Sequence, residues 1–233
     1  MFSSLVTGHW LPAQAKALSD DEGVVVVDPA LPANRSVSVL RIGDGATVLS
    51  VTPDRAAQIG VADGERLSPG EAIDRISDAG IELNDPDHLF YLPVEEHANV
   101  TASEPGADTR HLTADDAEAF AALAAAAPED DLDEAFVEID HWLVFGTFVD
   151  GRLAAAASMY PWSGTRLADL GVITLPEFRG RGLARSTVLA MAADALERGY
   201  EPQYRCQLDN APSVALALAS GFRRFGEWVV IDD

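Results

Sequence analysis

Apolar residues fall into short runs along this chain, and most runs have the alternating or fully apolar pattern of β-strands. In the first half, strands are predicted at residues 24–27, 37–42, 46–51 and 88–92. Helices are predicted to begin at Thr52-Pro53 and at Ser68-Pro69-Gly70-Glu71, where the second segment combines capping-box spacing with a proline in the first turn. The first half is therefore expected to form an α/β or α+β module.

The second half repeats this pattern with longer helices. Strands are predicted at residues 110–112, 142–149, 152–160, 167–174, 203–208 and 225–231. Asp150-Gly151 is a strong hairpin-turn signal. Helices are predicted at residues 114–126, with Thr113 as N-cap, at 131–139 and at 183–198, and a short Ala/Leu helix precedes Gly221-Phe222.

Small, polar, proline and glycine residues gather between about Asn99 and Thr109, which predicts a break in the chain. We therefore expect two domains, residues 1–100 as a smaller N-terminal α/β module of unknown role and residues 108–233 as the second. Residues 1–100 contain no catalytic motif, so a structural role is the simplest interpretation of the module.

The segment LGVITLPEFRGRGLA, residues 170–184, is the most informative part of the chain. An apolar run meets Pro176, passes through Arg179-Gly180-Arg181-Gly182 and opens into Ala-rich helical sequence. A strand that leads through glycines to a helix N-terminus favours phosphate binding, because unpaired N–H groups and the helix dipole attract anions. A plain strand-to-helix turn is the alternative. The spacing matches neither G-x-x-x-x-G-K-[ST] nor G-x-G-x-x-G.

This segment resembles the coenzyme A loop of the GNAT superfamily of N-acetyltransferases, whose motif is [QR]-x-x-G-x-[GA]. Arg179 to Ala184 match the motif, and Pro176 stands at the position of its usual proline. Downstream, Asn210-Ala211-Pro212-Ser213 and Gly221-Phe222 resemble the N-x-x-[AS]…G-F segment of the superfamily. The resemblance covers roughly Asp108 to Asp233, and it implies a mixed, largely antiparallel sheet flanked by helices.

The first half resembles the poorly characterised N-terminal halves that precede some GNAT domains, and a degenerate copy of the same fold is one explanation. GNAT domains often continue into another strand beyond the last one predicted here. Either that strand is absent, or the first half supplies the missing neighbour in the sheet.

The resemblance also assigns roles to residues. It implies that backbone groups of three strand residues pair with the pantetheine arm of acetyl-CoA: Val172, Ile173 and Thr174. It implies that N–H groups of six loop residues hold the pyrophosphate: Arg179, Gly180, Arg181, Gly182, Leu183 and Ala184. The Arg181 and Arg185 side chains are either phosphate partners or a solvated helix face. Asn210 and Ser213 lie either near the cofactor or at the cap of the following helix.

The chemistry is less well specified by the sequence. Acetyl transfer to an amine needs a base for the amine and a proton for the leaving thiolate. The usual acid of the superfamily, a tyrosine seven residues after the asparagine, is replaced by Ala217. Asp169 and Glu138 are candidates for the base, although each fits a surface carboxylate as well. Tyr160-Pro161-Trp162 either lines the acceptor pocket or packs in the core.

The formal net charge of −22, from 38 acidic and 16 basic residues, argues against nucleic acid and anionic membranes as partners. It favours a cationic acceptor, either a small-molecule amine or a peptide amine. The single lysine, Lys16, together with abundant Asp, Glu, Ala and Val is typical of salt-accumulating halophiles, although GC-rich coding gives a similar bias. We expect a monomer or a homodimer.

No run of about twenty apolar residues and no secretory signal is found, and the one cysteine, Cys206, forms no intrachain disulfide. A cytoplasmic location is therefore expected. The five histidines have no metal-ligand spacing, so we expect no metal. An acetyltransferase that uses acetyl-CoA is the preferred interpretation. A non-catalytic acyl-CoA-binding or regulatory protein of the same fold and an unrelated α/β domain are the alternatives.

Overall fold

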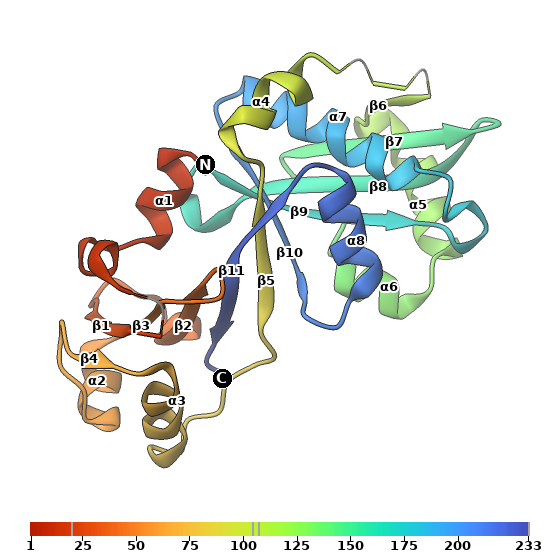
Figure 1. Ribbon diagram of the computed structural model, residues 1–233. Coiled ribbons are helices and arrows are strands. Elements are labelled where there is room, and N and C mark those ends of the chain that lie inside the picture. The colour runs from red at the N-terminus through yellow and green to blue at the C-terminus, as the bar shows by residue number, and fades with distance from the viewer. Residues whose placement is uncertain (20, 104, 107, 233) are drawn as a thin grey trace. The chain divides into compact units, whose positions relative to one another are not determined.

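The structure is a computed structural model that describes residues 1–19, 21–103, 105–106 and 108–232 (Figure 1). Its α-helices are α1 (Ser4–Trp10), α2 (Pro53–Ile59), α3 (Pro69–Asp78), α4 (Val94–Thr101), α5 (Ala117–Ala126), α6 (Glu129–Ala135), α7 (Leu183–Glu197) and α8 (Ala211–Ala219). Its strands are β1 (Gly23–Val27), β2 (Val37–Ile42), β3 (Thr47–Val51), β4 (Arg66–Leu67), β5 (Asp87–Tyr91), β6 (Thr109–His111), β7 (Leu143–Val149), β8 (Arg152–Pro161), β9 (Leu167–Thr174), β10 (Glu201–Gln207) and β11 (Arg223–Val230).

The chain forms two compact units, and each unit is assembled from three segments that are separate in the sequence. The main unit comprises Met1–Val6, Tyr91–Arg205 and Pro212–Arg223, and the second unit comprises Thr7–Phe90, Cys206–Ala211 and Arg224–Asp233. The expected domains, residues 1–100 and 108–233, stay a prediction, because compactness alone does not show that a segment folds independently.

In the second unit the strands lie in the order β4-β1-β3-β2-β11-β5. β1 and β3 are parallel, whereas β2 is antiparallel both to β3 and to β11. β11 is the last strand of the chain and β2 belongs to the first half. The first half therefore supplies a sheet neighbour to the last strand. The helix starts are confirmed: Thr52 caps α2, and Ser68 with Glu71 forms a capping box at α3.

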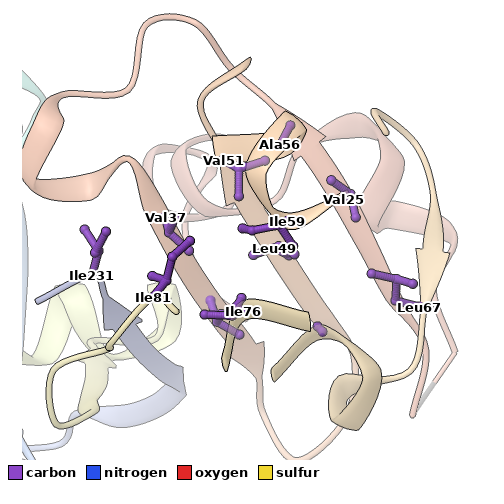
Figure 2. Packing of buried hydrophobic residues seen from close by; sticks show 12 residues of the cluster. Val25, Val37, Leu49, Val51, Ala56, Ile59, Leu67, Ile76, Ile81 and Ile231 are labelled. Carbon is purple, nitrogen blue, oxygen red and sulfur yellow. The ribbon is translucent and has the colours of Figure 1, made fainter. Parts of the chain in front are cut away.

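The core of the second unit is built from aliphatic side chains of its strands and helices. Leu49 of β3 lies against Ile59 of α2, and Ile76 of α3 packs into the same cluster (Figure 2). Ile231, just after β11, also belongs to this cluster. Neighbouring strand residues such as Val24 and Val25, or Val48 and Leu49, are both buried, which explains why these strands read as continuous apolar runs.

In the main unit the strands lie in the order β10-β9-β8-β7-β6. β9 and β10 are parallel, and the other neighbours are antiparallel. The Asp150-Gly151 hairpin is confirmed, with φ of +50° and +79°, the left-handed values that a tight hairpin turn needs. The expected mixed, largely antiparallel sheet flanked by helices is thus the observed architecture.

Helices cover both faces of this sheet. On one face, the Thr147 hydroxyl of β7 lies 2.6 Å from the Thr187 hydroxyl of α7. On the other face, Val144 of β7 packs in a cluster with Leu123 of α5. Because side chains alternate along a strand, residues 144 and 147 point to opposite sides. α7 and α5 therefore lie on opposite faces, as Figure 1 shows.

The structure corrects three of the expected boundaries. The helix expected at 131–139 is α6, which ends at Ala135 because Phe136 adopts a left-handed φ of +46°. The helix expected at 114–126 begins with a 3₁₀ turn at Ala114–Asp116, capped by Thr113, before α5 starts. Residues 99–101 of the expected break belong to α4, and residues 104 and 107 of that break lie outside the described residues.

Candidate functional site

The glycine-rich turn lies between the end of β9 and the start of α7, as the sequence predicts. Gly180 and Gly182 have φ of +73° and +79°, which side chains rarely adopt. A Cβ atom placed on either glycine would meet no heavy atom within 4 Å. The glycines are therefore required by the backbone conformation, and their outer side is open.

The first turn of α7 offers unused donors beside these glycines. The N–H group of Ser186 bonds to the carbonyl of Gly182 at 3.1 Å. The N–H groups of Leu183, Ala184 and Arg185 precede this bond, and a helix provides no acceptor for its first N–H groups. Together with the positive end of the helix dipole, these groups can hold an anion.

The three arginines of the turn play different parts. Arg179 is committed to the fold, since its Nε donates to the Thr174 carbonyl at 3.1 Å and its guanidinium pairs with Asp131 of α6. Arg181 and Arg185 are exposed. Within the part of the chain that the structure describes, neither has a carboxylate within ion-pair distance, although acidic residues outnumber basic ones 38 to 16. Two exposed arginines without a carboxylate partner are chemically suited to an anion.

The edge of β9 that leads to this turn is also available. β9 pairs with β10 from Leu167 to Leu170, and with β8 as far as Thr174. Among the described residues, positions 171–174 thus have a ladder partner on one side alone. The Thr174 hydroxyl is buried and has no hydrogen-bond partner in the described residues. An extended ligand could use this edge, including Val172 and Ile173, as an additional strand.

The two residues of the downstream motif are placed differently. Ser213 of α8 belongs to the main unit, and its Oγ lies 2.8 Å from the Tyr204 hydroxyl of β10. Asn210 belongs to the second unit, where its N–H donates to the Gln207 carbonyl at 3.2 Å just before α8. Ala217 is fully buried.

Asp169 is buried, which corrects the expectation of a surface carboxylate. Its oxygens accept hydrogen bonds from Arg205 at 2.6 to 3.1 Å, from Gln203 at 2.9 Å and from the Tyr160 hydroxyl at 3.1 Å. The strand register places Tyr160, Asp169 and Gln203 side by side on one face of the sheet. Gln203 extends the network to the Tyr91 hydroxyl. Asp169 is therefore the centre of a saturated polar network.

Burial, and then the charge of Asp169, raise the pKa of Tyr160 to about 12. Tyr160 therefore keeps its proton in the physiological range and acts as a donor. Its ring lies 5.0 Å from the His141 ring and 5.8 Å from Phe136. Trp162, the other aromatic residue of the expected acceptor pocket, is buried in the core.

Glu138 lies in the segment between α6 and β7, and its side chain is 52% exposed. Its Oε2 lies 3.5 Å from Nε2 of His141, and the Nδ1 atom of His141 lies 2.8 Å from the Ser158 hydroxyl. The backbone N–H of Glu138 donates to the same Ser158 oxygen at 3.3 Å. The sequence did not single out His141, because no spacing distinguishes it from the other four histidines.

The candidate site thus combines a glycine-rich turn at a helix N-terminus, a strand edge without a second partner in the described residues and a polar cluster on the α6 side of β8 and β9. In the described residues, no group of three His, Cys, Asp or Glu side chains is arranged to hold a metal ion. No helix among them is both long and apolar enough to cross a membrane.

Comparison with known proteins gives consistent matches. A family model described as GNAT acetyltransferase matches residues 96–231, more than half of the chain. The "Uncharacterized N-acetyltransferase YdfB" of Bacillus subtilis (strain 168) is 34% identical over 67 residues, which are 29% of this chain and 26% of that protein. The chain therefore matches about a quarter of the length of this curated relative.

Two solved structures are also similar. A protein assigned to the GNAT family from Novosphingobium aromaticivorans DSM 12444 is 27% identical, with a TM-score of 0.51 over 65% of this chain and 66% of that one. A GNAT-family acetyltransferase from Colwellia psychrerythraea is 20% identical, with a TM-score of 0.55 over 78% of this chain and 75% of that one. The second match is informative about the fold alone.

Proposed function

Because this chain belongs to the GNAT acetyltransferase family, we propose that it transfers an acetyl group from acetyl-CoA to an amine. The amine nitrogen attacks the thioester carbonyl directly, the C–N bond forms, and the C–S bond breaks to release coenzyme A. The observation that carries the proposal is the pair of unneutralised arginines, Arg181 and Arg185, at the N-terminus of α7 in a chain of net charge −22.

The proposed acetyl-CoA site consists of the glycine-rich turn with its two exposed arginines, the free edge of β9 and the hydroxyl of Thr174. The N–H groups around Gly182 and the side chains of Arg181 and Arg185 hold the pyrophosphate. The free edge at residues 172–174 pairs with the pantetheine arm, and the buried, unpartnered hydroxyl of Thr174 offers it one more polar contact. Arg179 keeps the turn in place through Thr174 and Asp131. Within the main unit, Ser213 of α8 is the residue of the downstream motif that is proposed to border this site.

For the proton transfers, the two carboxylates take different roles in the proposal. Asp169 already accepts hydrogen bonds from three side chains, so its role is to fix Tyr160, Gln203 and Arg205 rather than to act as a base. Glu138 is exposed, and in the proposal it belongs to the group of side chains that takes up the amine proton. With Ala217 buried in place of a tyrosine, water protonates the thiolate.

The acceptor in this proposal is a cationic small molecule or a peptide amine, because the negative field of the protein attracts cations. Neither nucleic acid nor a membrane surface is a proposed partner. We propose a cytoplasmic monomer or homodimer. The alternative function is a non-catalytic acyl-CoA-binding or regulatory protein, which the replacement of the usual acid by the buried Ala217 favours.

Calorimetric titration with acetyl-CoA tests the site. Gly182→Asp is expected to abolish binding, because it places a side chain and a negative charge where the pyrophosphate lies. Gly151→Asp is the matched control: Gly151 has the same φ of +79° and open surroundings, but it lies in the β7–β8 hairpin. Its variant is expected to bind like wild type. Wild-type affinity in Gly182→Asp would show that the turn does not hold the cofactor.

A further inference from the structure

The Glu138–His141–Ser158 cluster lies beside the point where the available edge of β9 ends. Ser158 of β8 is directly opposite Gly171 of β9, and Gly171 is the first residue beyond the last β9–β10 pair, Leu170–Tyr204. Alternation along β9 puts residues 169, 171 and 173 on one face of the strand. The cluster therefore lies where the unpaired edge of β9 meets the β9–β10 pairing, on the face of the sheet that α6 covers.

The direction of a bound acyl-CoA follows from the same geometry. If its pyrophosphate end is held at the turn after Thr174, as the proposed function has it, an arm added along residues 172–174 runs back toward Gly171. At residues 170 down to 167, β10 already pairs with this edge of β9. The arm therefore stops near Gly171, and its thioester lies close to Ser158 and His141.

Resting on the proposed acetyl transfer, we infer that His141 is the general base that takes the proton of the acceptor amine, with Ser158 and Glu138 as its positioning residues. When Nδ1 carries the proton and donates to Ser158, Nε2 has a free lone pair. Nε2 lies 3.5 Å from the Glu138 carboxylate. The carboxylate therefore stabilises the imidazolium that forms when the amine proton arrives.

The proton balance is closed. Starting from the ammonium form of the acceptor, one N–H proton passes to Nε2 before attack and frees the lone pair of the nitrogen. As the C–N bond forms and the electron pair of the C–S bond leaves on sulfur, a second N–H proton passes to water. The thiolate takes a proton from water, and His141 later returns its own proton to water. The products are the acetamide and coenzyme A.

The other groups around His141 do not replace it as the base. From β8, Tyr160 faces the ring, and the pKa of its hydroxyl, about 12, keeps that group protonated. Behind it, Asp169 is neutralised by Arg205. Phe136, on the other side of the ring at 5.2 Å, carries no charge. The side chain of Glu138 is about half exposed, and among the described residues its ion-pair partner is His141.

His141→Asn tests the inference kinetically, because asparagine keeps a polar atom near Nδ1 but cannot take a proton. With benzylamine, which is a cation at neutral pH, kcat/KM is expected to fall by about a hundredfold or more. With hydroxylamine, which is already mostly neutral, the loss is expected to be smaller. Ser158→Ala is expected to lower kcat and to move the pH profile. His111→Asn, at an exposed histidine of β6, is the matched control and should keep wild-type rates.

A second measurement needs no variant. The ring protons of all five histidines are followed by NMR while acetyl-CoA is added to the wild-type protein. The His141 signal is expected to shift most, and a bound sample in which it does not move would overturn the inference, as would an unchanged benzylamine rate in His141→Asn. Failure of the proposed function looks different, because the wild-type protein would then either not bind acetyl-CoA in calorimetry or bind it without turnover on benzylamine, hydroxylamine or any other amine.

Discussion

At the scale of single residues, the largest difference between expectation and structure concerns Asp169. Its sequence context, a carboxylate on a strand leading to a glycine-rich turn, favours a surface charge and leaves a base as the alternative. The structure shows a third state, a buried carboxylate held by Arg205, Gln203 and Tyr160. Gln203 and Arg205 come from a strand more than thirty residues away, so no local pattern predicts this network.

Asp169→Asn is expected to destabilise the protein by about 3 kcal/mol, because it removes the buried charge that accepts hydrogen bonds from Arg205, Gln203 and Tyr160. Asp194→Asn breaks the Asp194–Arg198 pair on the surface of α7 and should cost less than about 1 kcal/mol. Denaturant unfolding of both variants measures the difference. Equal effects would mean that the network does not stabilise the fold.

At the scale of elements, the sequence predicts β9 at residues 167–174 and the start of α7 at Leu183 correctly, because these segments combine clear periodicity with proline and glycine boundaries. It fails at α6. The apolar pattern continues through Val137 and Ile139, which pack into the core below the helix. Phe136, however, turns the chain out of the helix. Val137 and Ile139 are apolar because the segment after α6 packs in the core, and their spacing resembles that of a continuing helix in the sequence.

The close approach of α6 to β9 depends on Gly171. A Cβ atom on Gly171 would lie 1.7 Å from the Ala135 carbonyl oxygen, which is backbone and cannot turn aside. Gly171→Ala should therefore displace α6 and cost about 1–3 kcal/mol of unfolding free energy. Gly70→Ala, in the first turn of α3 with open surroundings, should be neutral or slightly stabilising. A Gly171 variant as stable as wild type would contradict the packing of α6 on β9.

At the scale of the whole molecule, charge is the dominant property. The net charge of −22 is large for 233 residues, and repulsion among carboxylates weakens the compact state at low salt. We predict that the melting temperature rises steeply from low salt to molar potassium chloride, as expected for a halophilic protein. A melting temperature that stays flat across this range would leave coding bias as the explanation of the composition.

The pH dependence of the reaction also belongs to the whole site. An amine must lose its proton before it attacks, so the rate should rise with pH until the acceptor and the basic group are deprotonated. Because Ala217 replaces the usual phenol, no falling limb from a tyrosine acid is expected at alkaline pH.

The most direct test of the central claim is release of coenzyme A from acetyl-CoA, measured with a panel of amines, amino acids and peptides. Acetyl-CoA binding is confirmed by calorimetry in the same preparation. We predict turnover with at least one cationic amine, at a rate that rises with pH and vanishes in Gly182→Asp. Tight binding of acetyl-CoA without turnover on any acceptor would contradict the enzymatic function and support the non-catalytic alternative.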